Sequence, residues 1–247
     1  RDTDRSRGLG DVYKRQYQMS TSKLDYWHWV DALYMVMPVM VKMYDITKNP
    51  LYLEKLHQYL TVTDSIMYDR EVGLYYRDAK YPYPFHKTIN GKKDFWSRGD
   101  GWAFAAFAKV LKQLPAEDKY REEYITRFQT MAKSIAACQQ PEGYWTRSLI
   151  DPEQAPGPET SGTALFTYGF LWGINNGLLN ADIYSPIVEK AWNYLKTTAL
   201  QADGKIGYIQ PVGEKAIPGQ VVDANSCFNF GIGAFLLAAC ERVRFLQ

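Results

Sequence analysis

The sequence is poor in the residues that build metal centres, disulfide frameworks and nucleic-acid surfaces. It contains three cysteines and three histidines in 247 residues. The cysteines, Cys138, Cys227 and Cys240, are odd in number and lack metal-ligand spacing, which favours buried free thiols. Basic residues exceed acidic ones by 29 − 27 = 2, so the sequence lacks the large positive charge that is typical of a nucleic-acid-binding protein. No apolar run reaches the roughly 18 residues of a membrane span, so no membrane insertion is expected.

Several motifs that mark catalytic or metal sites are also absent. The histidines, His28, His57 and His86, are too dispersed for a metal site by spacing. The sequence has neither a glycine-rich phosphate loop nor a serine nucleophile elbow. We therefore expect no metal site formed by these histidines. Aromatic residues, by contrast, make up 15% of the chain, with 19 tyrosines and 7 tryptophans. Aromatic-rich clefts are common in carbohydrate-binding proteins, although many of these rings must belong to the core.

The first sixteen residues differ from the rest of the chain. Residues 1–16 are rich in arginine and aspartate, carry few apolar side chains and show no helical period. We interpret them as a disordered tail or as sequence foreign to the native fold. Residues 17–247 are expected to form a single domain.

Helical periodicity dominates that domain and predicts an all-α fold. The predicted helices cover residues 30–44, 51–67, 100–111, 120–137, 161–172, 184–197 and 226–243. The loops between them contain a weak repeat at 71–77, 141–147 and 202–208, with Gly73, Gly143 and Gly204 spaced 70 and 61 residues apart. This spacing fits one helical hairpin plus its loop, and hairpins that cannot bury their own faces must stack or close into a ring. We predict an α/α toroid with its long loops on one functional face. The seven helices would be the C-terminal part of a six-hairpin ring, which has twelve.

The most informative motif lies at residues 96–102, which read WSRGDGW at the start of an apolar helix. Two tryptophans flank Arg98, Gly99 and Asp100. Aromatic rings beside a guanidinium suit a sugar acid, with the rings on the sugar face and the arginine on the carboxylate. The alternative is a glycine-rich turn with core tryptophans and an Arg98–Asp100 ion pair.

Three other helix openings carry polar side chains. Asp31 begins an apolar helix, where it is either a capping or first-turn residue or an acid whose apolar neighbours raise its pKa. Glu159 begins the segment ETSGTALF, and Asp223 precedes the last helix. Capping is the simpler interpretation of both. If the hairpins form a ring, all of these openings converge.

Three of these motifs resemble the unsaturated rhamnogalacturonyl hydrolases of glycoside hydrolase family 105 and, more distantly, the unsaturated glucuronyl hydrolases of family 88. They are WVDALYM at 29–35, WSRGDGW at 96–102 and ETSGTALF at 159–166. The resemblance implies an (α/α)6 barrel, and the substrate is a 4,5-unsaturated uronic acid, here of the galacturonyl type, at the non-reducing end of lyase-generated pectin or rhamnogalacturonan oligosaccharides. The resemblance implies that the enzyme hydrates the vinyl ether and releases the next sugar, and it implies no metal and no cofactor.

The resemblance also implies roles for individual residues. Asp31 would be the general acid and then the base for water, with Trp29 and Met35 desolvating it. Arg98 would hold the substrate carboxylate, and Trp29, Trp96 and Trp102 would be sugar platforms. Arg77 stands where some members carry histidine, and His86 or Lys87 would compensate. The full expected substrate-binding set is Trp29, Met35, Arg77, His86, Trp96, Arg98, Gly99, Trp102 and Glu159.

Other interpretations remain open at this point. A sugar epimerase or isomerase uses the same toroid, but such enzymes rely on histidine pairs that this sequence lacks. A binding remnant would keep the aromatic platform without turnover. An ordinary inverting hydrolase would need a second carboxylate roughly 6.5–9.5 Å from Asp31, and Glu159 is the candidate by motif. The resemblance places such proteins in the bacterial cytoplasm or periplasm.

Overall fold

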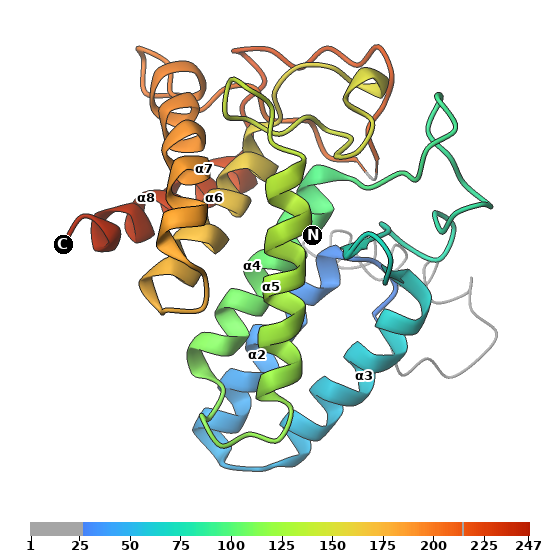
Figure 1. The fold of residues 1–247 in the computed structure, drawn as a ribbon, viewed down its shortest axis with the longest axis vertical. Coiled ribbons are helices and arrows are strands. Elements are labelled where there is room, and N and C mark those ends of the chain that lie inside the picture. Colours follow the sequence, from blue (N-terminus) through green and yellow to red (C-terminus); the bar gives the residue numbers. More distant parts are fainter. Residues whose placement is uncertain (1–26, 214) are drawn as a thin grey trace, which may run out of the picture.

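The computed structural model describes residues 27–213 and 215–247, so the expectation for residues 1–16 lies outside the described part. Within that part the regular secondary structure is almost entirely helical, and long loops join the helices (Figure 1). The helices are α2 (Asp31–Thr47), α3 (Leu51–Met67), α4 (Ser97–Gln113), α5 (Arg121–Ala137), α6 (Thr160–Asn175), α7 (Ala181–Tyr194) and α8 (Asn229–Phe245). A π-helical turn, η2 (Leu195–Ala199), extends α7, and η1 (Pro152–Gln154) is a short 3-10 turn. The strands β1 (Tyr68–Asp69) and β2 (Leu74–Tyr75) form a small antiparallel hairpin.

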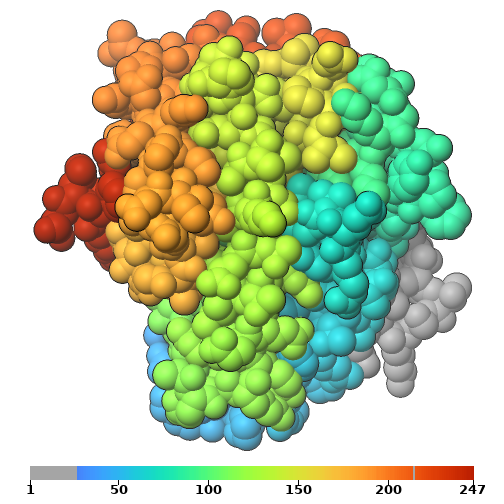
Figure 2. Space-filling view, in the orientation of Figure 1, coloured from blue at the N-terminus to red at the C-terminus, as the bar shows by residue number. Residues whose placement is uncertain are grey.

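The helices form two layers. Helices α2, α4, α6 and α8 pack against one another in chain order, and we call them the inner helices. Each of α3, α5 and α7 packs against the inner helix that precedes it, and we call these the outer helices. Figure 2 shows α5 and α7 side by side on one face of the molecule. The predicted all-α architecture of repeated hairpins is therefore confirmed.

The inner helices α4 and α6 are buried around their whole circumference over most of their length. An outer helix covers one side of each, and neighbouring inner helices cover the flanks, so α6 is largely apolar and α4 is apolar from Trp102 to Ala108. The Phe104 ring stacks on Phe128 at 4.6 Å and meets Phe170 edge-on at 5.3 Å. A Cβ at Gly169 would lie 2.4 Å from the Phe104 ring, so glycine allows α4 and α6 to approach this closely.

The loop repeat is a structural repeat as well. Gly73, Gly143 and Gly204 all adopt positive φ angles, of 80°, 97° and 85°, which glycine tolerates without a steric penalty. The carbonyl four residues beyond each glycine accepts a 2.9 Å hydrogen bond from the backbone N–H at the start of an inner helix. These bonds are Val30 N to Arg77 O, Ser97 N to Arg147 O and Thr160 N to Tyr208 O. Each loop thus anchors the N-terminus of the inner helix belonging to the preceding hairpin.

Some sequence expectations need correction. The last helix begins at Asn229 and not at residue 226, because the Asp223 carboxylate accepts the Asn225 N–H at 2.9 Å and closes a turn there. The three thiols are free, as expected, but none is fully buried, since Cys138 and Cys227 are half-buried and Cys240 is exposed. No helix in the described ranges is long and apolar enough to cross a membrane. The same residues contain no cluster of histidine, cysteine and carboxylate side chains suited to a metal ion.

Candidate active site at the mouth of the inner helices

The loop anchors align the N-terminal ends of the inner helices with one another. The residues that follow the anchored N–H groups are Asp31 in α2, Arg98 in α4 and Ser161 in α6. A glycine follows both Arg98 and Ser161, and Phe230 in α8 likewise precedes Gly231. These four side chains therefore occupy equivalent positions at one end of the inner helices, which we call the mouth. Of the four, Asp31 and Arg98 are charged.

Asp31 is the first residue of α2, where the positive end of the helix dipole favours a carboxylate. Its Oδ2 atom is buried and accepts no hydrogen bond. Burial raises the pKa of the Asp31 carboxyl, and the positive charges of Arg77 and Arg98 act against that rise. A carboxyl with a raised pKa and an unoccupied oxygen is suited to deliver a proton near neutral pH.

Arg77 and Trp29 lie next to Asp31 in the structure. The backbone carbonyl of Arg77 anchors Val30, and Trp29 forms a backbone bridge with Asp78. The Arg77 guanidinium donates a 2.5 Å hydrogen bond to the Asp78 carboxylate. The loop after β2 therefore holds one of the two positive charges that Asp31 experiences.

Arg98 is buried between two aromatic rings. Its Cζ atom lies 4.6 Å from the centre of the Trp96 ring and 4.7 Å from that of Phe230. Nη1 donates to the carbonyl of Gln210 at 2.6 Å, and Nη2 donates to that of Pro211 at 2.9 Å. Burial lowers the pKa of Arg98, while the nearby Glu159 and Asp31 carboxylates oppose this. The guanidinium therefore binds neutral carbonyls, and its role toward a substrate carboxylate stays a prediction.

The expected tryptophan platforms are only partly open. Trp96 is 3% exposed and Trp102 is 8% exposed, because Trp96 stacks on Arg98 and Trp102 packs on Tyr34 at 4.7 Å. Trp29 alone of the three is half-buried. Met35 is 54% exposed, so a covered Met35 side chain is not the source of the burial around Asp31.

Two glycines at the mouth, Gly99 and Gly162, have a packing role. A Cβ at Gly99 would lie 2.7 Å from Val30 Cγ1, and one at Gly162 would lie 2.1 Å from Ser97 Oγ. Glycine at these positions lets α2, α4 and α6 converge at their N-terminal ends. Gly99 is thus explained by helix approach.

The suggested Arg98–Asp100 ion pair is wrong. Asp100 is completely buried and accepts the Tyr75 N–H at 2.8 Å, while Arg98 bonds elsewhere. Thr163 holds the same place in α6 and accepts the Trp145 N–H at 3.1 Å. Burial raises the pKa of Asp100 well above its ordinary value. Asp100 therefore tethers β2 to α4 and does not belong to the mouth.

Glu159 is a helix cap, and the inverting-hydrolase role suggested for it is not supported. Its carboxylate accepts four hydrogen bonds, from the N–H and hydroxyl of Ser161 and from the N–H groups of Gly162 and Gln210. It is completely buried. A completely buried carboxylate whose two oxygens both accept backbone N–H groups is a cap and is not exposed to a water molecule that it could activate.

His86 lies in the loop between β2 and α4. Its Nε2 atom is 2.7 Å from the Asp94 carboxylate, and its ring meets Tyr81 edge-on at 4.6 Å. The structure thus places His86 with Asp94 and Tyr81, and a role in substrate binding stays a prediction.

Two residues of the mouth were missed by sequence reasoning. Phe230 could have been found from the glycine that follows it, by analogy with Arg98 and Ser161. Gln210 lies in a long loop, and no sequence pattern singled it out.

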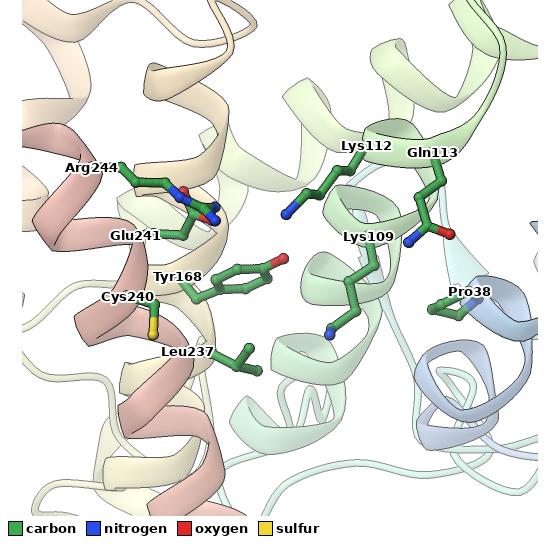
Figure 3. A pocket seen from close by; sticks show the side chains of 9 residues that line it. All are labelled: Pro38, Lys109, Lys112, Gln113, Tyr168, Leu237, Cys240, Glu241 and Arg244. Atoms are coloured by element: carbon green, nitrogen blue, oxygen red, sulfur yellow. The ribbon is translucent and has the colours of Figure 1, made fainter. Parts of the chain in front are cut away.

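A separate pocket lies toward the other end of the inner helices (Figure 3). Its lining side chains include Lys109, Lys112, Tyr168, Glu241 and Arg244. Lys109 is eleven residues beyond Arg98 in α4, which is about 16 Å along a helix axis. This pocket contains none of the predicted site residues.

The inner helices gather their N-terminal ends around the Asp31 carboxyl, which feels the charges of Arg77 and Arg98, and the repeated hairpins define an α/α-toroid protein. The sequence profile described as Glycosyl Hydrolase Family 88 matches residues 7–246. The chain belongs to this family.

The relatives agree with that assignment. The chain is 37% identical over 236 residues to a protein of Formosa agariphila described as unsaturated 3S-rhamnoglycuronyl hydrolase, covering 94% of this chain and 62% of that protein. A solved structure described as glycosyl hydrolase family 88 from Bacteroides vulgatus is 99% identical, with a TM-score of 0.88, and the match covers 94% of this chain and 66% of that one. A family 105 glycoside hydrolase from C. acetobutylicum shares the fold at 22% identity and a TM-score of 0.71, with 95% and 72% covered. The chain therefore spans less than two thirds of the curated relative, and both family 88 and family 105 share its helical-toroid fold.

Proposed function

We propose that the protein removes a 4,5-unsaturated uronic acid from the non-reducing end of oligosaccharides made by polysaccharide lyases. Membership in Glycosyl Hydrolase Family 88 and the 37% identical relative described as unsaturated 3S-rhamnoglycuronyl hydrolase support this class of substrate. The observation that carries the proposal is Asp31 at the mouth, a half-buried residue whose carboxyl has a raised pKa and a buried Oδ2 atom that accepts no hydrogen bond.

The reaction is a hydration of the vinyl ether. Asp31 donates its proton to C4 of the unsaturated ring, and positive charge develops at C5 and the ring oxygen. Water adds at C5 and returns a proton to the Asp31 carboxylate. The hemiketal then opens, the bond to the next sugar breaks, and an open keto acid leaves. One carboxyl serves as acid and then as base, which requires a pKa near the working pH.

We further propose that the natural substrates are of the galacturonyl, pectin-derived type. Elimination makes C4 and C5 of the uronate planar, so the stereochemical difference between glucuronate and galacturonate at C4 is erased. The enzyme must therefore distinguish the two classes by the configuration of the glycosidic bond and by the sugar beyond it. Arg77 and His86, in and beside the loop that follows β2, are our candidates for contacts to that next sugar.

The test follows the ultraviolet absorbance of the conjugated double bond in an unsaturated galacturonyl–rhamnose disaccharide. The parent chain, Asp31→Asn and Asp203→Asn are compared. Asp203 is an exposed carboxylate paired with Lys205 at 2.6 Å, so its substitution is a matched control. We expect the absorbance to fall with the parent and with Asp203→Asn but not with Asp31→Asn. Equal loss with Asp31→Asn would rule out Asp31 as the proton donor.

Substrate class is tested separately with the corresponding glucuronyl-derived disaccharide. Faster loss of absorbance with the glucuronyl-derived sugar would contradict the pectin assignment while leaving the reaction class intact. No loss with either sugar, together with heat of binding in a calorimeter, would identify a carbohydrate-binding protein without turnover.

A further inference from the structure

Gln210 is a completely buried residue whose side chain is committed to the mouth. Its Oε1 atom accepts the indole N–H of Trp96 at 2.8 Å. Its Nε2 group donates to the carbonyl of Lys215 at 2.8 Å and to Oε1 of Gln220 at 3.0 Å. An indole nitrogen only donates, so the amide oxygen must face Trp96 and the orientation of the amide is unambiguous.

The backbone of Gln210 hydrogen-bonds to Arg98 and to Glu159. Its carbonyl accepts the 2.6 Å hydrogen bond from Arg98, and its N–H donates to Glu159 at 3.0 Å. The side chain of the same residue holds the tryptophan on which Arg98 stacks. Gln210 therefore fixes one hydrogen-bond acceptor of the Arg98 guanidinium and also the Trp96 ring on which that guanidinium stacks.

We propose that Gln210 is a positioning residue that fixes the Arg98 guanidinium within electrostatic range of the Asp31 carboxyl and so tunes the acid of the reaction. This rests on the proposed function for the role of Asp31, and Gln210 itself contacts no reacting atom in this scheme.

The proposal predicts the direction of a pKa change. Asp31 faces Arg77 from the loop after β2 and Arg98 from α4, and Arg98 in turn faces Glu159 at 3.9 Å. Both arginines lower the pKa of Asp31 against the effect of burial. If Arg98 is no longer fixed by Gln210 and Trp96, its positive charge moves away from Asp31 and the pKa of Asp31 rises. A general acid must be protonated, so the alkaline limb of activity then moves to higher pH.

The experiment compares the parent, Gln210→Leu, Arg98→Met and the double variant. The control is Gln139→Leu, because Gln139 also bridges two carbonyls, those of Gly143 and Ile187, both at 2.9 Å, but belongs to the hairpin loop between α5 and α6. Carbon-13 NMR titration of the Asp31 carboxyl gives its pKa whether or not the chain turns over. The pH dependence of kcat/KM on the unsaturated disaccharide is the second measurement.

We expect the pKa of Asp31 and the alkaline limb to rise in Gln210→Leu and in Arg98→Met, and to be unchanged in Gln139→Leu. In the Arg98→Met background, Gln210→Leu should add no further rise. An unchanged Asp31 pKa in Gln210→Leu, or an equal additional rise in the double variant, would overturn the proposal. If Gln210→Leu does not fold, Gln210→Asn replaces it, because the shorter amide cannot reach Trp96 and both acceptors at once. A parent without activity refutes the proposed function, while the titration still decides this inference.

Discussion

The closest helix approach at the mouth gives a sharp stability prediction at Gly162. A Cβ there would lie 2.1 Å from Ser97 Oγ, 3.0 Å from Glu159 Oε2 and 3.1 Å from the Ser97 carbonyl carbon. The serine hydroxyl has no hydrogen bond in this structure and is able to rotate away. The carbonyl carbon belongs to the backbone and cannot. Gly162→Ala must therefore push α6 away from α4 or disturb the Glu159 cap.

The magnitude follows from two opposing terms. Overpacking a well-packed interior destabilises a protein by ~1–3 kcal/mol, and contacts this short belong at the upper end. Replacing glycine by alanine within a helix gains ~0.5–1 kcal/mol. The expected net loss for Gly162→Ala is about 2 kcal/mol in the free energy of unfolding. For a domain of this size, that corresponds to a fall in Tm of about 4–8 °C.

Gly233 in α8 provides the matched control. A Cβ there would meet nothing within 4 Å, and the position is exposed. Gly233→Ala should therefore stabilise the protein by ~0.5–1 kcal/mol through helix propensity alone. Urea unfolding monitored by circular dichroism measures both variants. The reasoning is refuted if Gly162→Ala is as stable as the parent, or if the two alanine variants shift stability in the same direction.

Two further stability predictions concern buried carboxyl groups. Burial raises the pKa of Asp100 in the folded state, so folding favours the protonated carboxyl. The folded protein is therefore most stable at low pH with respect to this group. That stability is lost as pH rises from the unfolded pKa of Asp100 toward its folded pKa. Asp100→Thr keeps an acceptor for the Tyr75 N–H, as Thr163 does for Trp145. The free energy of unfolding of this variant should therefore decline less between pH 4 and pH 8 than that of the parent. Identical slopes of the urea midpoint against pH in the two proteins would contradict this. Glu159→Gln sets an amide among N–H donors and removes a charged acceptor, so we expect a loss of about 2 kcal/mol in urea unfolding, and a loss near zero would show that the cap contributes little.

The arrangement around Arg98 explains how a buried charge can influence Asp31. The guanidinium hydrogen-bonds to two neutral carbonyls and lies between two rings. The nearby Glu159 carboxylate, 3.9 Å away, is already occupied by backbone and hydroxyl donors. The positive charge of Arg98 is therefore held in place by neutral carbonyls and rings, and although Glu159 partly offsets it, it still lowers the pKa of Asp31.

Helix positions and the loop repeat were accessible from the sequence because both are local. The apolar period predicted α3 and α5 almost to the residue, and the turn glycines at 73, 143 and 204 marked positive φ angles. The start of the last helix was predicted less accurately, because the Asp223 carboxylate closes a turn with Asn225 and α8 begins only at Asn229.

The roles of individual residues at the helix openings were not accessible in the same way. Asp31, Asp100 and Glu159 all stand near the start of an inner helix, and the same residue types occur in caps, tethers and acids. The difference lies in their distant partners. Asp100 binds Tyr75, Glu159 binds Gln210, and the buried Oδ2 of Asp31 accepts no hydrogen bond.

The sequence by itself determined the helical hairpins, their repeat and the motifs that gather at one end, because hydrophobic period, turn glycines and short motifs act over a few residues. Only the tertiary structure decided which of those motif residues pack and which remain available. Trp96 is buried beneath Arg98 and Trp102 is buried against Tyr34, and Gln210 joins the mouth from 112 residues beyond Arg98 in the chain. The burial of Asp31 and the charges around it come from residues of separate hairpins, and these residues meet only once the helices have packed.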